Sequence, residues 1–528
     1  MTREMSSKPK PLSFSTTMRN PNRIASFLNQ ILPFENHILT NEIIMKVVHN
    51  NIQNKLYKPN YIKHNHALND IYENEDLQFS DDQVEEIIIN SPQDHKEAGF
   101  DKGWPSRFDT WYALPKEFGF LYYEMNKPIK ISNIGHMLID ALNEETPNEK
   151  KIQNVFLNSM MKYQTNNPFR KNSNANVPLV LLLKVIKLLK DDPDENDAGL
   201  FRKELSLLIC WNDDDADAIY KMIKKIRHDV GLNYSDEYMY DLCLEVLGCL
   251  TTEEKEKNKK YYKMDKICGE AIDEYIRKMR STGILSLRGN GRFLDFNTFE
   301  QQKIDYVLNN YSTFSSFDNC EDYYKYIGEI DNNILTITDE VEVPQKDEVK
   351  LKTLQKFASQ YSKETIYNEL LKLSARKESK DEILKFISAP TRLEFLTSIA
   401  LMQNFDNIVV MPSYPVDDEG LPTMTAGGDT PDIVCYDDSY HSLFEVTLMC
   451  GRADQVNNEI VPIKRHLLER KKINENTFSV FVAPVVHSDT KDIAEWYKHK
   501  DNVDILTMTI LEMIEKFKNI NILKQLLD

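Results

Sequence analysis

Two acidic residues near the C-terminal end of the chain, Asp432 and Glu445, have the spacing and surroundings of a metal site. Asp432 follows Pro431 at the start of an expected strand over 431–436, and Glu445 lies among apolar residues in the next expected strand, 442–449. A charged residue in an apolar strand is costly unless it is paired or binds a metal. Because a polar turn joins the two strands, we expect the carboxylates to lie side by side on one edge.

Such a pair indicates Mg²⁺-assisted hydrolysis of a phosphate ester. Two carboxylates held together repel each other, and a hard divalent cation relieves the repulsion. Mg²⁺ accepts one or two carboxylates, retains several waters and takes its other ligands from a substrate phosphate. It lowers the pKa of a bound water and stabilises the charge on the scissile phosphate. A Pro-Asp…Glu pair alone is a weak signal, so its context must support it.

Three further residues lie on helices that flank the pair in the sequence. Glu394, on the preceding helix, either joins the acidic site or pairs with Arg392. Glu459 and His466, on the following helix, are seven residues apart and therefore share one face. A glutamate and a histidine that face a metal centre could orient water or assist proton transfer. An exposed position beside Arg465 is an equally good interpretation of His466.

The C-terminal part shows a regular order of elements. We expect helices over 380–405, 452–473, 490–500 and 509–527, and strands over 407–411, 431–436, 442–449, 478–486 and 503–508. Apolar strands that alternate with helices indicate a mixed sheet covered on both faces. Pro462 should disturb the second of these helices locally.

The N-terminal half indicates helical domains with winged-helix hairpins. A helix that contains Arg107 should end or kink at Pro115, before two strands around an Asn126–Lys127 turn. Another helix ends near Arg280, before two strands around the turn 288–292. A winged helix can place its helix in the major groove of DNA and its wing on phosphate. The alternative is a protein-interaction module or a spacer.

The composition is that of a multidomain protein. Its 528 residues exceed one core, and 41% hydrophobic residues suffice for packed domains. No apolar run reaches the roughly 20 residues that cross a bilayer, and the N-terminus lacks the pattern of a signal peptide. Seven cysteines occur singly, which argues against a zinc site or a disulfide framework and predicts a cytoplasmic protein.

The net charge of −18 conceals a basic N-terminal segment. Residues 1–64 contain nine Lys and Arg residues but only three Glu, and a second basic stretch covers 464–472. Acidic residues gather at 191–197, 213–217 and 329–348. This distribution is compatible with a nucleic-acid face on an acidic body, or with chance clustering of solvated charges.

Several of these stretches resemble the AlwI family of type IIS restriction endonucleases, which includes strand-specific nicking relatives. Near the carboxylates they are Gly428-Asp-Thr-Pro-Asp432, Phe444 to Arg452 and Glu459 to Leu467. Residues 12–24 and 283–293 resemble the family too. The resemblance therefore involves both ends and the middle of the chain.

The resemblance implies a PD-(D/E)XK nuclease domain with a central mixed sheet over 351–528. It would follow a linker region, 311–350, and a DNA-recognition region with winged-helix-like subdomains, 1–310. Such a protein, the nuclease of a restriction-modification system, would recognise a short asymmetric double-stranded DNA site and cut a few bases outside it with Mg²⁺.

Site residues are carried over on matching positions. The predicted metal ligands are Asp432, Glu445 and Val446, and the predicted catalytic residues are Glu394, Asp432, Glu445, Glu459 and His466. We expect DNA contacts from Arg19, Arg23, Arg107, Arg288 and Arg292.

One position departs from the general nuclease signature. The lysine expected two residues after the glutamate is Thr447 here, as it is absent from AlwI-like proteins generally. Its usual role, positioning the attacking water, would then fall to Lys464 or His466.

Three alternatives stay open: a nicking endonuclease, a catalytically silent DNA-binding protein with the nuclease fold, and an RNA or repair nuclease. The intact acidic residues argue against the silent protein. Cleavage of both strands would require a transient homodimer or a second subunit.

Overall fold

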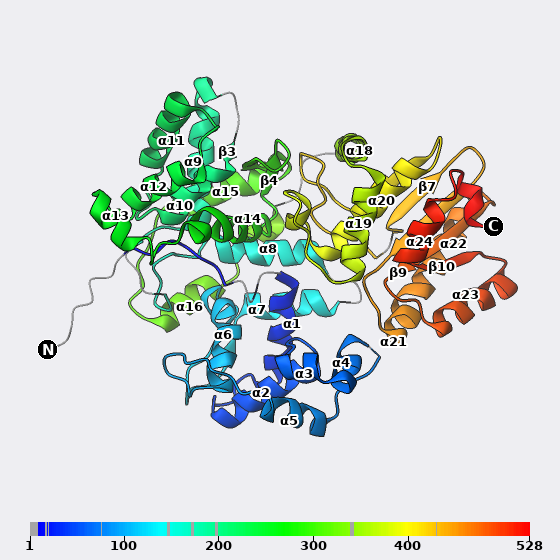
Figure 1. Ribbon diagram of the computed structural model, residues 1–528, viewed down its shortest axis with the longest axis horizontal. Helices are drawn as coiled ribbons and strands as arrows, with labels where there is room; N and C mark the ends of the chain where they lie inside the picture. The colour runs from blue at the N-terminus through cyan, green and yellow to red at the C-terminus, as the bar shows by residue number, and fades with distance from the viewer. Residues whose placement is uncertain are drawn as a thin grey trace. The chain divides into compact units, whose positions relative to one another are not determined.

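The computed structural model describes residues 9–15, 18, 21–74, 76–144, 148–170, 174–195, 199–337, 343–428 and 430–528 (Figure 1). The chain forms two compact units. Unit 1 consists of residues 1–57 and 91–340, and unit 2 consists of residues 58–90 and 341–528.

These units differ from the predicted domains in two respects. Residues 58–90, expected in the N-terminal region, belong to unit 2. The expected linker contains two helices of unit 1, α16 (Cys320–Gly328) and α17 (Asn332–Thr336). Tyr323 is fully buried, and Asp331 accepts a hydrogen bond of 2.7 Å from the Tyr311 hydroxyl. The stretch is acidic, as a linker often is, but its aromatic residues fasten it to a core.

Unit 1 is mainly helical. Its helices are α1 (Pro21–Ile31), α2 (Asn41–Gln53), α6 (Trp104–Glu117), α7 (Asn133–Asn143), α8 (Glu149–Met160), α9 (Pro178–Asp191), α10 (Leu205–Cys210), α11 (Ala216–Val230), α12 (Asp236–Val246), α13 (Thr252–Asn258), α14 (Ala271–Arg280), α15 (Gln301–Asn310), α16 and α17. Its strands form an antiparallel pair, β1 (Leu121–Tyr122) and β2 (Lys130–Ile131), and an antiparallel sheet of β3 (Leu200–Phe201), β5 (Phe293–Phe296) and β4 (Leu285–Arg288), in that order.

Both predicted hairpins lie where the sequence places them. Asn126 has a φ of 64° between β1 and β2, and Gly289, Asn290 and Gly291 all have positive φ between β4 and β5. Glycine and asparagine tolerate this left-handed region best, which explains these turns. The structure corrects one detail, because α6 continues past Pro115 to Glu117 and ends where the Phe118 N–H donates to the Leu114 carbonyl.

The helices ahead of the hairpins are core helices, which contradicts a groove-reading role for them. No residue of α6 or α14 is exposed. The aromatic side chains of α6 are buried, Trp111 and Tyr112 fully, and Lys278 on α14 donates to the Met18 carbonyl at 2.9 Å. A recognition helix must present side chains to base edges in a groove. The sequence shows a helix followed by a hairpin but not what covers the helix.

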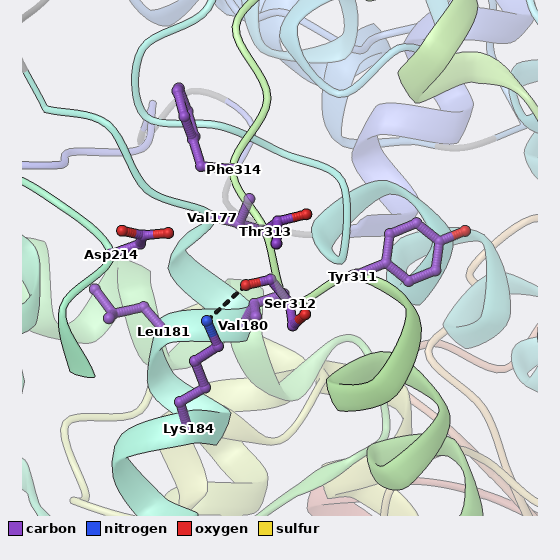
Figure 2. Close-up of a pocket in the computed structure, with 9 residues that line it drawn as sticks. All are labelled: Val177, Val180, Leu181, Lys184, Asp214, Tyr311, Ser312, Thr313 and Phe314. Carbon is purple, nitrogen blue, oxygen red and sulfur yellow. Dashed lines mark hydrogen bonds between the residues drawn. The ribbon is translucent and has the colours of Figure 1, made fainter. Parts of the chain in front are cut away.

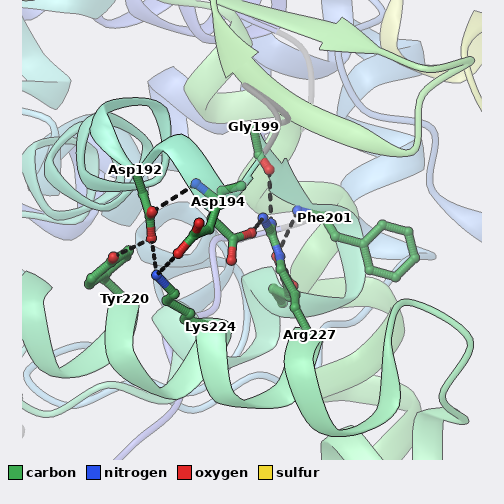
Figure 3. Close-up of polar contacts among 9 residues, drawn as sticks. Asp192, Asp194, Gly199, Phe201, Tyr220, Lys224 and Arg227 are labelled. Atoms are coloured by element: carbon green, nitrogen blue, oxygen red, sulfur yellow. Dashed lines mark hydrogen bonds and ion pairs between the residues drawn. The ribbon is translucent and has the colours of Figure 1, made fainter.

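A polar network fastens α11 to the segment that leads into β3 (Figure 3). Arg227 donates to Glu204 and to Glu195, at 2.7 Å in each case. One turn earlier, Lys224 binds Asp192 at 2.5 Å. Glu204 is fully buried, and burial raises the pKa of its carboxyl although the Arg227 guanidinium opposes the rise. The charge of Arg227 therefore makes the burial of Glu204 tolerable.

Replacement of Arg227 by methionine should destabilise unit 1. Removing one partner of a buried ion pair costs about 3–5 kcal/mol, because the other charge stays buried. Chemical denaturation of the full chain should show the shift. Lys187→Met, which removes an exposed pair with Asp191, should cost less than about 0.5 kcal/mol. Similar small losses for both variants would contradict this role of the network.

Unit 2 contains a mixed sheet, as the sequence predicts (Figure 1). Its five strands lie in the order β10-β9-β8-β7-β6. The strands are β6 (Val409–Pro412), β7 (Ile433–Tyr436), β8 (His441–Val446), β9 (Thr477–Ala483) and β10 (Ile505–Thr509). β7 is antiparallel to both β6 and β8, whereas β8, β9 and β10 run parallel. Every residue of β9 is buried, as expected of a strand inside a covered sheet.

Helices cover both faces of this sheet. Those that contact it are α20 (Ala389–Asn404), α22 (Ile460–Lys471), α23 (Ser488–Asp501) and α24 (Ile510–Phe517). Unit 2 also contains α18 (Val343–Gln360), α19 (Lys363–Ser374) and α21 (Arg452–Asp454), and residues 58–90 add α3 (Asn60–His64), α4 (His66–Glu73) and α5 (Asp81–Ile89). α22 and α23 pack on the face that carries Leu443 and Phe481, whereas the Phe444 ring meets Phe517 of α24 on the other face.

Alternation along β8 then decides where Glu445 points. Residues two apart on a strand face the same side, so Glu445 shares the face of Leu443 and is directed toward α22. Ile463 and Leu467 of α22 pack against that face. The helix that carries His466 therefore lies across the strand that carries Glu445.

None of the helices within the described ranges has the length and apolar character of a membrane span.

Candidate active site

The β7–β8 hairpin holds Asp432 and Glu445, hereafter the carboxylate pair, side by side, as the sequence predicts. Ile433 pairs with Phe444, so the next residue outward on each strand belongs to the pair. The Asp432 N–H donates to Glu445 Oε2 at 3.3 Å, and the Val446 N–H donates to Asp432 Oδ2 at 2.7 Å. Backbone donors of one strand thus orient the carboxylate of the other.

Burial makes this pair costly to ionise. It raises the pKa of the Asp432 carboxyl well above its usual range, and the charge of Glu445 raises it further. Asp432 as a whole is half-buried. Burial also raises the pKa of Glu445, which is 6% exposed. A cation between the two oxygen donors would relieve both effects.

Glu459 acts on the pair electrostatically, because its charge raises the pKa of both Asp432 and Glu445. It ends a π-helical turn, Gln455–Glu459, between α21 and α22. Pro462, which lacks an N–H, cannot continue the α-helical bonding backward, and this favours the wider turn. The predicted disturbance at Pro462 is therefore the feature that places Glu459. Burial raises the pKa of Glu459, and a hydrogen bond with the Thr447 side chain opposes the rise.

His466 belongs to the same site. Its Nδ1 lies 2.9 Å from Glu445 Oε1, and the side chain is 6% exposed, which rules out the exposed interpretation. An ionised carboxylate only accepts hydrogen bonds, so Nδ1 carries the proton when Glu445 is charged. The imidazole thus fixes the orientation of Glu445.

Glu394 acts on the segment that leads into β7. It is buried on α20, and its Oε2 accepts a hydrogen bond of 3.0 Å from the Ala426 N–H. Arg392, the alternative partner considered from the sequence, donates to the carbonyls of Leu384 and Ile387. Glu394 therefore holds the chain six residues ahead of Asp432.

The two candidates for the role of the missing lysine point in different directions. Lys464 binds Asp501 of α23 at 2.5 Å and lies over the Tyr497 ring. His466 contacts the carboxylate pair directly. Of the two, His466 is the residue with access to that site.

Sequence reasoning missed Gln455, a fully buried residue of the π turn. Its Nε2 donates to the carbonyls of Met449 (3.2 Å) and Val485 (2.7 Å), and its Oε1 accepts from the Thr490 hydroxyl at 3.1 Å. It joins the loop after β8 to the loop after β9. No sequence signal marks it, because its partners are two backbone carbonyls and a hydroxyl that only the fold brings together.

The two arginines of the β4–β5 hairpin that are predicted to contact DNA differ in their exposure and in their contacts. Arg288 folds back onto its own hairpin, where it binds Asp295 at 2.7 Å and donates to the Phe296 carbonyl. Arg292 is exposed at the turn, with its guanidinium 5.8 Å from the centre of the Phe201 ring. Arg288 is half-buried, whereas Arg292 is exposed.

The other predicted DNA contacts lie earlier in unit 1. Arg23 donates to the Leu56 carbonyl at 2.9 Å, and Arg107 donates to the Tyr57 hydroxyl at 2.6 Å. Arg19 lies outside the described residues. Arg23 and Arg107 thus have structural partners that a DNA phosphate would have to replace.

A shallow hollow in unit 1 takes no part in this site (Figure 2). Residues of α9 and of the segment 311–314 line it. The Lys184 ammonium reaches across to the Ser312 carbonyl at 2.6 Å, as the dashed line in Figure 2 shows. None of the predicted site residues lines this hollow.

The donor set of the carboxylate pair fits Mg²⁺. Among the residues that the structure describes, no three His, Cys, Asp or Glu side chains form a ready-made cluster for an ion. Mg²⁺ does not need one, since it takes one or two carboxylates and completes its shell with water and phosphate. The pKa values of Asp432 and Glu445 are raised because burial disfavours their negative charge, and such an ion would balance that charge.

A buried carboxylate pair on adjacent strands, with a glutamate and a histidine from the next helix, has the features of a metal-assisted phosphodiester hydrolase. The model of the AlwI restriction endonuclease family matches residues 116–342 and 329–520. These regions cover well over half of the sequence, so the chain belongs to that family. It is a restriction endonuclease, an enzyme that cleaves DNA at defined sites.

Solved structures of restriction endonucleases show low similarity to the chain. The small subunit of the heterodimeric restriction endonuclease R.BspD6I is 20% identical, over 29% of this chain and 74% of that subunit, with a TM-score of 0.24. Restriction endonuclease FokI is 14% identical, over 98% and 97% of the two chains, with a TM-score of 0.23. FokI bound to DNA is 14% identical, over 97% and 95%, with a TM-score of 0.21. No curated protein sequence matches the chain.

Asp432→Asn should stabilise the metal-free protein. A carboxyl whose pKa is raised by folding binds its proton more tightly when folded, so stability falls as pH rises from about 4 through the folded pKa. Each pKa unit of the rise corresponds to about 1.4 kcal/mol, or roughly 3–6 °C in the melting temperature of a domain of this size. Calorimetry in a metal chelator should show a higher melting temperature for the variant and a weaker decline with pH.

Asp438→Asn, in the exposed turn between the same strands, is the matched control and should leave the melting curve unchanged. A less stable Asp432→Asn protein at neutral pH would mean that the carboxylate pair is not held at an energetic cost.

Proposed function

We propose that this restriction endonuclease is of the type IIS kind: it recognises a short asymmetric site in double-stranded DNA and hydrolyses phosphodiester bonds a few bases outside it with Mg²⁺. The observation that supports this proposal is the placement of the carboxylate pair in unit 2, apart from the core of unit 1. A nuclease unit with its own core can act at a distance from the bases that a separate unit reads.

In this proposal the carboxylate pair binds Mg²⁺, with Val446 beside it as a further candidate ligand. The ion, when bound, lowers the pKa of its water and offsets the charge on the phosphate. His466 holds Glu445 in position for the ion. Glu459, whose charge acts on the pair, accepts a proton from the attacking water or orients it. Glu394 keeps the segment before Asp432 in place.

Unit 1 supplies DNA recognition in this proposal. Arg292 is available for a phosphate or a groove edge, since it is exposed at the tip of a hairpin. Arg19, Arg23, Arg107 and Arg288 remain candidates, and the last three would exchange their present partners for DNA. All seven cysteines are free thiols, which is consistent with the reducing cytoplasm as the place of action.

The number of strands cut depends on a second site. One carboxylate pair per chain acts on one phosphodiester bond at a time, so cleavage of both strands requires a second copy of the chain or another subunit. A protein that acts alone would nick one strand.

Plasmid DNA tests the proposal directly. The purified protein should produce fragments of defined length with Mg²⁺ and none in a chelator, and Asp432→Ala and Glu445→Gln should abolish cleavage because each removes an ion ligand. Asp438→Asn should cleave as the wild type does.

Binding of DNA without any strand breaks would identify a silent DNA-binding protein instead, and a nonspecific smear would indicate a repair-type nuclease. Nicked circles in place of linear DNA would indicate a single-strand cutter.

His466→Gln should lower the cleavage rate by about 10–100-fold, the usual loss when a residue that orients a metal ligand is replaced. The Mg²⁺ concentration for half-maximal rate should rise as well, because Glu445 loses its partner. Lys464→Met is the matched control on the same helix, since its partner is Asp501. Equal effects of the two substitutions would place His466 outside the site.

A further inference from the structure

Two loops form the rim of the candidate active site. The first, Thr447–Arg452, follows β8, and the second, Val485–Ser488, follows β9. Because β8 and β9 are parallel and Val446 pairs with Val482, both loops leave the sheet at the same edge. Glu445 lies one residue before the end of β8, so these rim loops border the carboxylate pair.

The rim loops are held in a fixed arrangement by Gln455. Its side chain bonds the Met449 carbonyl in the first loop and the Val485 carbonyl in the second. The His487 N–H donates to Gln455 Oε1 at 3.4 Å. A fully buried amide with partners in both loops is the kind of support that preorganises a binding site.

The rim loops bind a carboxylate from another part of unit 2. The Arg452 N–H donates to Asp76 Oδ1, and His487 Nε2 lies 3.3 Å from Asp76 Oδ2. His487 Nε2 also lies 2.7 Å from the Cys450 carbonyl, an acceptor, so this nitrogen carries the proton. A backbone N–H that donates to this carboxylate group, and an imidazole beside it that can carry a positive charge, make an anion-binding position.

The chemistry of this position suits a phosphate diester. A phosphate presents the same pair of charged acceptor oxygens as a carboxylate, and charge-assisted bonds from N–H groups hold either one. The Arg452 guanidinium is 59% exposed in an open ion pair with Asp489, so it can turn toward a ligand at little cost. The substrate of this enzyme is a polyanion that must pass close to the carboxylate pair.

The segment that supplies Asp76 has the wrong charge to accompany DNA. Residues 58–90 contain eight acidic and two basic residues. The carboxylate of Asp76 and a DNA phosphate cannot occupy the same position, and their like charges repel each other at close range. The rim loops therefore cannot bind Asp76 and DNA at the same time.

We propose that the rim loops bind a backbone phosphate of the DNA next to the cleaved bond, and that Asp76 occupies this position in the absence of DNA. The proposal rests on the proposed function, since it assigns a substrate contact to the same site. Asp76 takes the place of the phosphate until DNA displaces it, and its negative charge weakens the binding of DNA.

Hydrogen exchange on the full-length protein tests the contact without reference to activity. The Arg452 amide should exchange slowly in the wild type and faster in Asp76→Ala. Asp76→Asn retains an acceptor oxygen and should keep most of the protection. Addition of DNA with Ca²⁺ in place of Mg²⁺ should speed exchange in residues 76–80 while Arg452 stays protected. Unchanged exchange in that segment on DNA binding would overturn the exchange of ligands.

DNA binding measured with Ca²⁺ tests the phosphate. Asp76→Asn and Asp76→Ala should bind DNA more tightly, whereas Asp70→Asn, an exposed position on the same segment, should not. His487→Gln should weaken binding. Arg452→Gln, which keeps the N–H but removes the guanidinium, should reduce the slope of log affinity against log salt by about 0.9, the contribution of one phosphate. One such contact accounts for about three- to four-fold of the loss in affinity between 50 and 200 mM salt.

The two proposals fail in different ways. A wild type that neither binds nor cleaves DNA with a divalent ion defeats the proposed function, whatever the exchange data show. A wild type that cleaves DNA, with Asp76 and His487 variants that bind and cleave as it does, leaves the proposed function intact and overturns the phosphate site.

Discussion

Repulsion between two buried carboxylates is the constraint on which the rest of unit 2 depends. The β7–β8 hairpin forces Asp432 and Glu445 together, and burial raises the pKa of both. Such an arrangement persists only if the surrounding sheet fixes it firmly, and the antiparallel ladder between the two strands does so. A cation bound between the two carboxylates would relieve this repulsion.

The helix after β8 is shaped to serve that pair. A regular α-helix through 452–471 would set Glu459 and His466 on a fixed spacing, whereas the π turn before Pro462 adds a residue and adjusts the position of Glu459. The same turn buries Gln455, which joins the rim loops. One irregular stretch thus positions an acidic residue, a histidine partner of Glu445 and the loops through which DNA would approach.

Unit 1 shows how far a local pattern can be misread. A helix followed by a hairpin was predicted around Arg107 and again around Arg280, and both occur. Their helices are nevertheless covered, because α6 is rich in aromatic residues and Lys278 on α14 finds a carbonyl inside the unit. The accessible surface of unit 1 therefore lies elsewhere, and exposed side chains such as Arg292 are better candidates for DNA contact than residues of these helices.

The sequence alone determined the mixed sheet, the order of its elements along the chain and the juxtaposition of Asp432 with Glu445, since strand periodicity and a short hairpin are local properties. The order of the strands within the sheet came from the structure. The family also follows from the sequence. Tertiary structure alone decided that His466 faces Glu445 while Lys464 turns to Asp501. It also decided that residues 58–90 belong with the nuclease unit and that Gln455 bridges two loops. These outcomes depend on packing between segments that are far apart in the chain, and the spacing of residues along the sequence does not reveal such packing.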